Sequence, residues 1–277
     1  MSLITILNPL EAFSYNFFIR AFVVLILLSL ILPVIGIRLA GKGFSMISDT
    51  LSHTSLAGIA VGLVIGVLPV WTAIIFSVIA AALIELIRRK MPKHQDLALT
   101  IILSFSLGLA GILSQFTPSS NFESYLFGSP FTLSNNDMII LIIVVAVGLL
   151  YEILFYRSNM ALSYDENECK ANKMPVVFLS FLDTVITSVV IAVAANMIGS
   201  LLVASFISIP VAAGLKISHS SKGSQIASIT VSLVASLIGL FVAYTFSLHV
   251  GGTIVMVNLL GLIICFIISS IQNKKRC

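Results

Sequence analysis

Residues 45–66 have the sequence SMISDTLSHTSLAGIAVGLVIG, and the interpretation of the whole chain starts from this stretch. It is apolar enough to enter a membrane, yet it carries Asp49 and His53 in its first half. Residues four apart in a helix lie on one face, one turn from each other. Three hydroxyl residues are expected on the same face: Ser45, Ser48 and Ser52. The stretch therefore predicts a helix with one polar stripe.

The second half of this stretch carries Gly58, Gly62 and Gly66 at intervals of four residues. Small residues at that spacing let two helix backbones approach closely in lipid. The sequence thus predicts a membrane helix that presents a metal-binding pair on one side and packs tightly behind it.

The composition indicates an integral membrane protein. Of 277 residues, 58% are hydrophobic and 9% are charged, and the mean hydropathy is +1.13. Soluble domains carry about 25% charged residues. Repeated long apolar runs favour helices over a barrel. The longest polar stretch, near residues 157–175, is too short to form a separate core, so residues 1–277 are expected to form a single transmembrane domain.

The apolar runs predict nine membrane spans, although eight or ten are also compatible with the pattern. The net charge of +4 is better used for topology than as a sign of nucleic-acid binding. Basic residues follow the first, third, fifth, seventh and ninth spans, which predicts an outer N-terminus and a cytoplasmic C-terminus. The expected spans are 16–40, 45–67, 70–88, 97–116, 138–156, 176–195, 198–217, 225–247 and 253–271.

Residues 158–175 form the largest polar segment expected on the cytoplasmic side. Asp165, Glu166 and Glu168 lie where a helix could begin, and acidic residues favour a helix N-terminus because of the helix dipole. Two interpretations stay open: a short amphipathic helix that docks into a partner's cleft, or an ordinary solvated loop.

Asp49 and His53 are the main candidates for chemistry. Ionisable groups inside a membrane are costly and usually functional. A carboxylate and an imidazole both bind zinc or manganese. The alternatives are a buried Asp–His hydrogen bond and a proton relay. Two ligands are fewer than the four of a closed zinc site, but a two-fold dimer would supply two of each.

Two further residues are weaker candidates for binding metal. His249 precedes a Gly-Gly pair in an expected outer loop, where it either receives a metal or is simply exposed. Asp183 lies within the sixth span, where it either faces the pathway or caps a neighbour.

Glu85 precedes Arg88 and Arg89 by three and four residues, which is good spacing for a helical ion pair at the membrane edge.

The chain has none of the sequence patterns of an enzyme that were sought. It has no G-x-x-x-x-G-K-[ST] phosphate loop, so ATP-driven activity requires a separate subunit. It also has no H-E-x-x-H motif and no serine-centred nucleophile elbow.

Several segments resemble the permease subunits of metal-ion ABC importers for zinc and manganese. The resemblance is carried by GKGFSMISDTLSHTSLAGIAVGL, MIGSLLVASFISIPVAAG and LHVGGTIVMV, and it covers almost the whole chain. The segment SYDENECKANKMPV resembles the part that docks on the ATPase. That part of the family usually begins Phe-Asp and continues Ala-x-x-x-Gly, whereas this chain has Tyr164-Asp165 and no glycine at 172–174.

The resemblance implies an all-α transmembrane bundle of about eight or nine spans, like the vitamin B12 importer (a type II ABC importer). It implies a homodimer in the cell membrane, two cytoplasmic ATPase subunits and an extracellular metal-binding protein. It places Asp49 and His53 along the pathway, and Tyr164, Asp165, Glu166 and Glu168 at the ATPase. No cofactor is expected to be permanently bound.

The form SDTLSH favours the zinc branch of this family over the manganese branch, whose usual form is closer to GDAISH. Manganese is the alternative cargo. Two hypotheses outside the family were also considered. One is a proton-coupled secondary transporter with Asp49, His53 and Asp183 as its relay, and the other is a structural membrane scaffold.

Overall fold

The computed structural model describes residues 11–43, 46–91, 95–116, 125–128, 130–218 and 220–274. The long elements among them are α-helices, and each of the nine expected spans corresponds to one of them, with ends within a few residues for most. The fifth differs more, because its helix continues to Tyr164. The helices are α1 (Asn16–Gly41), α2 (Ile47–Ile65), α3 (Pro69–Lys90), α4 (Gln95–Ser114), α6 (Asn135–Tyr164), α7 (Glu166–Ala171), α8 (Val176–Ile198), α9 (Ser200–Ile217), α10 (Ser221–Phe246) and α11 (Val250–Lys274), with short 3-10 turns at η1 (Glu11–Ser14) and η2 (Pro130–Thr132).

Eight helices of the described chain are long and apolar enough to cross a membrane. The long helix missing from that set is α2, the second span expected from the sequence. Its acid, its imidazole and its hydroxyl residues lower its hydropathy. At 19 residues it is still about 29 Å long, close to the hydrocarbon thickness of a bilayer. The all-helical fold of eight to nine spans is therefore confirmed.

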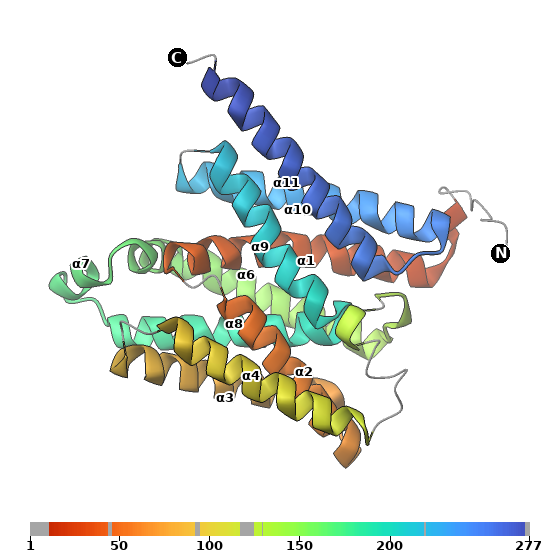
Figure 1. Ribbon diagram of the computed structural model, residues 1–277, viewed down its shortest axis with the longest axis horizontal. Helices are drawn as coiled ribbons and strands as arrows, with labels where there is room; N and C mark the ends of the chain where they lie inside the picture. Colours follow the sequence, from red (N-terminus) through yellow and green to blue (C-terminus); the bar gives the residue numbers. More distant parts are fainter. Residues whose placement is uncertain are drawn as a thin grey trace.

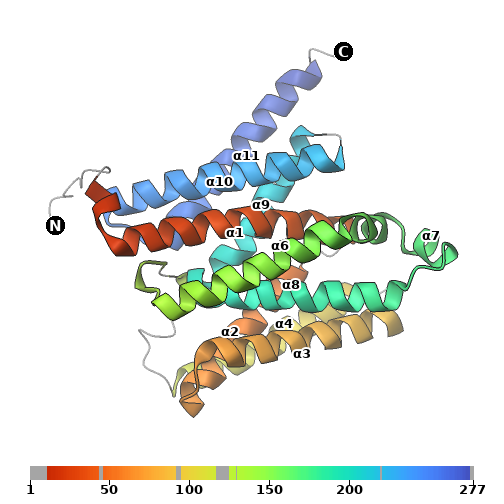
Figure 2. The same cartoon turned by 180° about the vertical axis from the view of Figure 1, so that it is seen from behind.

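The long helices alternate in direction between two ends of the molecule (Figure 1). Helices α2, α4, α9 and α11 lie on the face seen in Figure 1. Helices α1, α3, α6 and α10 are in front when the molecule is seen from behind (Figure 2). The short helix α7 projects at the end where α1, α3 and α6 finish. The basic residues of these helix ends therefore lie at the same end of the molecule.

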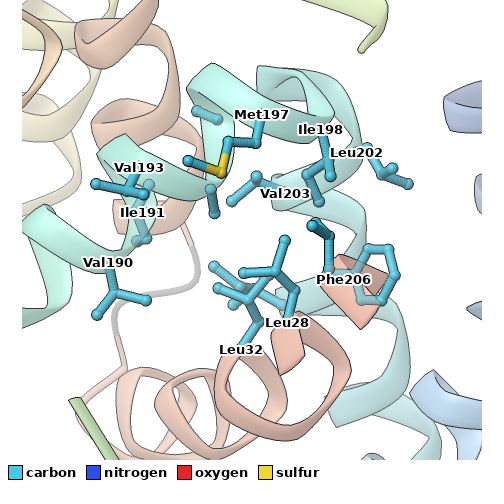
Figure 3. Close-up of a cluster of buried hydrophobic side chains, with 14 of the residues drawn as sticks. Leu28, Leu32, Val190, Ile191, Val193, Met197, Ile198, Leu202, Val203 and Phe206 are labelled. Carbon is cyan, nitrogen blue, oxygen red and sulfur yellow. The ribbon is translucent and has the colours of Figure 1, made fainter. Parts of the chain in front are cut away.

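Helix α1 forms the centre of the core together with α8 and α9. Leu28 and Leu32 of α1 point toward apolar side chains of α8 and α9 (Figure 3), and these two leucines are fully buried. Because lipid is as apolar as leucine, such a core is held by close packing rather than by removal from water. The labelled partners are Val190, Ile191, Val193, Met197, Ile198, Leu202, Val203 and Phe206.

The glycines of α2 show how this helix is packed. A Cβ added at Gly58 would lie 2.6 Å from the backbone oxygen of Thr72 in α3, and one at Gly62 would also meet Thr72. The predicted close approach is therefore confirmed for these two positions. Gly66 has another role: it has φ +78° and ends the helix, and its N–H donates to the Gly62 carbonyl at 2.9 Å.

Candidate metal site and coupling segment

Asp49 and His53 lie one turn apart on α2, and both are half-buried. Their neighbours Ser48 and Ser52 are buried against the rest of the chain, so the pair occupies the more open part of the polar face. Ser45, expected on the same face, is outside the described residues. His53 Nδ1 is buried and has no hydrogen-bond partner among the described residues. This ring nitrogen is therefore left for another partner.

Hydroxyl groups on the other faces of α2 hold the helix in place. Thr54 Oγ1 donates to the Thr50 carbonyl at 2.7 Å and lies 2.9 Å from Ser106 Oγ of α4. Ser55 Oγ donates to the Ala192 carbonyl of α8 at 3.3 Å. With α3 packed against Gly58, contacts with α3, α4 and α8 fix the direction of the open face of α2.

The described part of one chain provides only the two expected ligands. It contains no group of three or more His, Cys, Asp or Glu residues that could hold a metal ion. Among the same residues, no lysine or arginine forms an ion pair with Asp49. The direct Asp49–His53 hydrogen bond, one of the sequence alternatives, is not formed there either.

Asp183, the weaker candidate ligand on α8, has two cationic partners instead. Arg38 Nη1 lies 2.6 Å from Asp183 Oδ1, and Lys42 Nζ lies 2.5 Å from Asp183 Oδ2. Arg38 also contacts Glu152 Oε1 of α6 at 2.7 Å and donates to Thr187 Oγ1 at 3.2 Å. We call Arg38, Lys42, Glu152 and Asp183 the buried ion network.

The buried ion network balances two cations against two carboxylates. Arg38 is 1% exposed and Asp183 is 2% exposed. An acid whose oxygens already contact two cations is a poor ligand for a third, so we leave Asp183 out of the metal set. The relay of Asp49, His53 and Asp183 is also not assembled as one cluster. Sequence reasoning missed Glu152, although a charged residue within a span signals that a buried partner exists.

His249 lies in the turn between α10 and α11, and its side chain is exposed. This turn is at the end of the molecule away from α7 (Figure 1). The structure therefore does not bring His249 together with Asp49 and His53, and a role in receiving metal stays a prediction.

The polar segment 158–175 contains a helix, as one of the two sequence interpretations expected. Asp165 caps α7: its side chain accepts hydrogen bonds from the backbone N–H groups of Asn167 and Glu168. Tyr164 is 71% exposed and Glu168 is also exposed. These side chains are free to meet a partner, and docking on an ATPase stays a prediction.

Glu166 points back toward the membrane helices rather than outward. Arg88 Nη1 lies 2.8 Å from Glu166 Oε2, and Lys170 Nζ lies 2.9 Å from Glu166 Oε1. Partial burial raises the pKa of Glu166, but the hydrogen bonds and charges of Lys170 and Arg88 outweigh it and hold that pKa below its ordinary value. Sequence reasoning placed Glu166 at the partner surface and did not find this tie to α3.

The ion pairs expected at the end of α3 are present. Arg88 Nη2 and Arg89 Nη2 each lie 2.9 Å from Glu85 Oε1. Arg88 Nη2 also donates to Ser180 Oγ of α8 at 2.8 Å. Arg88 thus joins α3, α7 and α8 at one point.

The turn after α7 contains a residue in a left-handed conformation. Lys173 has φ +57°, which costs a non-glycine residue about 1–2 kcal/mol. Glycine adopts this conformation without that cost, and the sequence has none at 172–174.

Comparison with known protein families now places this architecture. The ABC 3 transport family matches residues 14–270. The chain belongs to the ABC 3 transport family. It is a membrane-embedded permease subunit of an ABC transporter.

Two curated relatives of this ABC 3 permease match over nearly their whole length. The "Probable metal transport system membrane protein" of Treponema pallidum is 29% identical, over 95% of this chain and 99% of the relative. The manganese transport system membrane protein MntC of Listeria monocytogenes is 27% identical, over 95% and 96%. Metal transport is therefore the shared activity of these relatives, and the chain is a permease of that kind.

Two solved structures have the same fold. PsaBC from Streptococcus pneumoniae in complex with Fab gives a TM-score of 0.82 and 29% identity, over 92% of this chain and 93% of that chain. A metal-chelate type ABC transporter in an inward-facing conformation gives a TM-score of 0.74 and 16% identity, over 96% and 90%. The second likeness concerns the fold alone and agrees with the expected vitamin-B12-importer-like architecture.

Proposed function

We propose that this ABC 3 permease imports manganese, and that Asp49 and His53 from two copies of the chain bind the ion in transit. The observation that carries the proposal is that this pair has no cationic partner within the described residues. A carboxylate and an imidazole lie one turn apart on a membrane-embedded helix, with no internal cation beside them among the described residues. A divalent cation supplies the missing charge.

The choice of metal rests on the relatives and on ligand chemistry. MntC of Listeria monocytogenes is named for manganese transport, and so is the manganese import system permease ScaB of Streptococcus parasanguinis. Neither of these names supports the zinc preference drawn from SDTLSH. Asp49 offers hard oxygen ligands and His53 a nitrogen ligand, a set that suits manganese as well as zinc.

A second copy of the chain completes the ligand set in this proposal. Helix α2 lies beside α9, whose more exposed positions include Ala204, Ser208 and Ala212 at four-residue intervals. Small residues at that spacing favour close approach of a second helix bundle. A pocket of about 170 Å³ between α1, α2 and α9 is lined by Ser48, Ser208 and Ala212. Two-fold pairing across this face would bring two Asp49 and two His53 side chains together.

In the proposed cycle, an extracellular metal-binding protein delivers the ion to the end of the molecule that carries His249. The ion then binds between the two α2 helices. Cytoplasmic ATPase subunits dock on α7 through Tyr164, Asp165 and Glu168, with Glu166 tying α7 to the membrane helices. His53 binds the metal in its neutral form. Rearrangement of the helices then separates the ligands and releases the ion inward.

Uptake into vesicles tests both the activity and the metal. The permease is reconstituted with its ATPase and binding-protein partners, and uptake of Mn²⁺ and Zn²⁺ is measured with and without ATP. We expect ATP-dependent uptake of Mn²⁺ in preference to Zn²⁺. Preferred uptake of Zn²⁺ would overturn the metal assignment, and uptake driven by a proton gradient without ATPase would overturn the mechanism.

Metal titration of the purified permease tests the shared site. We expect one high-affinity Mn²⁺ for every two chains, and none in a variant that stays monomeric. One ion per chain would contradict a site made from two copies.

A further inference from the structure

We propose that a continuous line of polar contacts carries movement of α7 to the metal-bearing helix α2. The line runs from Glu166 through Arg88, α8 and Lys42 to the connection between α1 and α2. This inference rests on the proposed function for its metal readout. It assigns positioning roles to residues that do not touch the ion.

The first link joins α7 to α8. Arg88 holds Glu166 of α7 with one nitrogen, at 2.8 Å, and Ser180 of α8 with another, at 2.8 Å. Arg89 donates to the Val177 carbonyl, also at 2.8 Å. The start of α8 is thus fixed to the end of α3 on two adjacent turns, and α7 is attached at the same point. A displacement of α7 pulls on this junction directly.

The second link uses α8 as a rigid strut. Asp183 follows Ser180 by three residues and so lies on the same face of α8, one turn further along. It contacts Lys42 Nζ at 2.5 Å and Arg38 at 2.6 Å. Lys42 is the C-cap residue of α1 and lies five positions before the start of α2 at Ile47. The end of α1, which shortly precedes α2 in the chain, is therefore tied to the same strut.

The third link returns from α8 to α2 itself. Ser55 Oγ of α2 donates to the Ala192 carbonyl at 3.3 Å. Helix α2 is thus attached to α8 by Ser55, after the Asp49/His53 pair, and Lys42 attaches the end of α1 to α8 shortly before α2 begins. A shift of α8 moves both attachment points together, so it changes the orientation of the pair rather than breaking the helix.

Ion pairs suit this role because their energy depends steeply on distance in a medium of low dielectric constant. The line is buried along most of its length: Lys42 is 7% exposed and Asp183 2% exposed in their side chains, and Arg88 is 12% exposed. Water therefore does not replace these contacts when the helices move.

The experiment measures how nucleotide changes metal affinity. The full complex of permease and ATPase is titrated with Mn²⁺, followed by its electron paramagnetic resonance, without nucleotide and with a non-hydrolysable ATP analogue. Coupling between two sites is a ratio of affinities, commonly about five- to 150-fold. We expect a ratio in this range for the natural sequence.

Three variants interrupt the line at different places. Arg88→Lys keeps the charge but cannot hold Glu166 and Ser180 in the same fork geometry. Lys42→Met with Asp183→Asn removes one cation and one carboxylate, so the buried charge stays balanced and folding is protected. Lys42→Arg keeps the contact and serves as the rescuing variant. Arg157→Lys, at an exposed position of α6, is the matched control for Arg88→Lys.

The inference predicts that the first two variants reduce the ratio to less than about twofold while metal affinity without nucleotide is unchanged. Lys42→Arg and Arg157→Lys retain the ratio. A purely structural role would lower thermal stability and leave the ratio intact, and this result would overturn the inference. Absence of Mn²⁺ binding in the natural sequence would instead overturn the proposed function, so the two failures are distinguishable.

Discussion

The buried ion network and the Asp49/His53 pair place ionisable groups in the same membrane bundle, and they do so in opposite ways. In the network, Arg38 and Lys42 face Glu152 and Asp183 at 2.5–2.7 Å. The α2 pair has no cationic partner among the described residues and stays half-buried. One site is complete within a single chain, and the other is not.

The difference lies in how each charge is neutralised. A charge that is neutralised inside the chain repays part of its desolvation cost through its partner. A carboxylate without such a partner avoids that cost by protonation, or recovers it from a cation that arrives from outside. The comparison therefore supports the proposal that α2 binds the transported ion and that the network positions the helices.

The largest expected effect is on the open pair. Asp49→Asn or His53→Gln should abolish metal uptake, because even residues that only orient a metal ligand change affinity by about 10- to 100-fold. Dimer assembly and ATPase binding should be retained, since neither side chain holds the fold. Vesicle uptake measures transport, and size-exclusion chromatography measures dimer assembly and ATPase binding. Asp96→Asn, at an exposed position of α4, is the matched control. Equal uptake by Asp96→Asn and Asp49→Asn would show that Asp49 does not bind the transported ion.

The second prediction breaks the closed network. Arg38→Met leaves Asp183 and Glu152 with Lys42 alone, and an uncompensated buried charge costs about 3–5 kcal/mol of stability. Thermal unfolding in detergent should show a large loss relative to Arg157→Met, which removes an exposed arginine of α6. If the two variants unfold at the same temperature, the network does not stabilise the bundle.

A third prediction tests the packing that orients the open pair. Gly58→Ala should destabilise the α2–α3 contact by about 1–3 kcal/mol, because its Cβ would lie 2.6 Å from the Thr72 backbone oxygen. Gly108→Ala in α4 meets nothing within 4 Å and should be neutral or stabilising by up to about 1 kcal/mol. Unfolding temperature and Mn²⁺ affinity are measured for both. If neither the unfolding temperature nor the Mn²⁺ affinity changes in Gly58→Ala, the close contact between α2 and α3 does not orient the pair.

The smallest expected effect concerns Glu166, a carboxylate at the membrane edge that, like Asp183, has two cationic partners. Its pKa is lowered in the folded protein, so the ionised form favours the docked position of α7. This contribution is complete above the ordinary pKa of 4.5 and is lost as the pH falls through the lowered value. A spin label at Asn167 should therefore gain mobility only below about pH 4.5.

Glu166→Gln is the matched control for this titration, because it removes the carboxylate and should remove the pH dependence of the label. An increase in mobility well above pH 4.5 in the natural sequence would contradict the assignment to Glu166.

The helices could be predicted from the sequence because a bilayer fixes their length. Apolar runs of about 20 residues located the nine long helices, most to within a few residues. The pair Asp49/His53 was found because both residues lie four apart in one helix, where spacing alone determines the face. The same reasoning located the Glu85 pairs with Arg88 and Arg89.

The contacts between distant segments could not be predicted in this way. Asp183 and Arg38 are 145 positions apart in the sequence, and nothing in the local pattern says that α1 and α8 are neighbours. Asp183 was therefore named as a weaker candidate ligand or as a cap for a neighbour, and its ion pairs with Arg38 and Lys42 were not expected. Glu166 was assigned to the partner surface for the same reason, because its tie to Arg88 depends on how α3 and α7 meet.

The contact between α2 and α3 has a consequence for how the protein is made. Helix α2 is too polar to count among the candidate spans, whereas α3 is strongly apolar. Asp49 lies in the first turn of α2 and His53 in the second, and with the hydroxyl residues they lower its hydropathy, so α2 alone would partition less readily into the bilayer during synthesis than α3. The turn at 66–68 and the glycine contacts with Thr72 allow the two helices to enter as one hairpin. Helix α2, which carries Asp49 and His53, would thus depend on α3, a later segment of the nascent chain, for its place in the membrane.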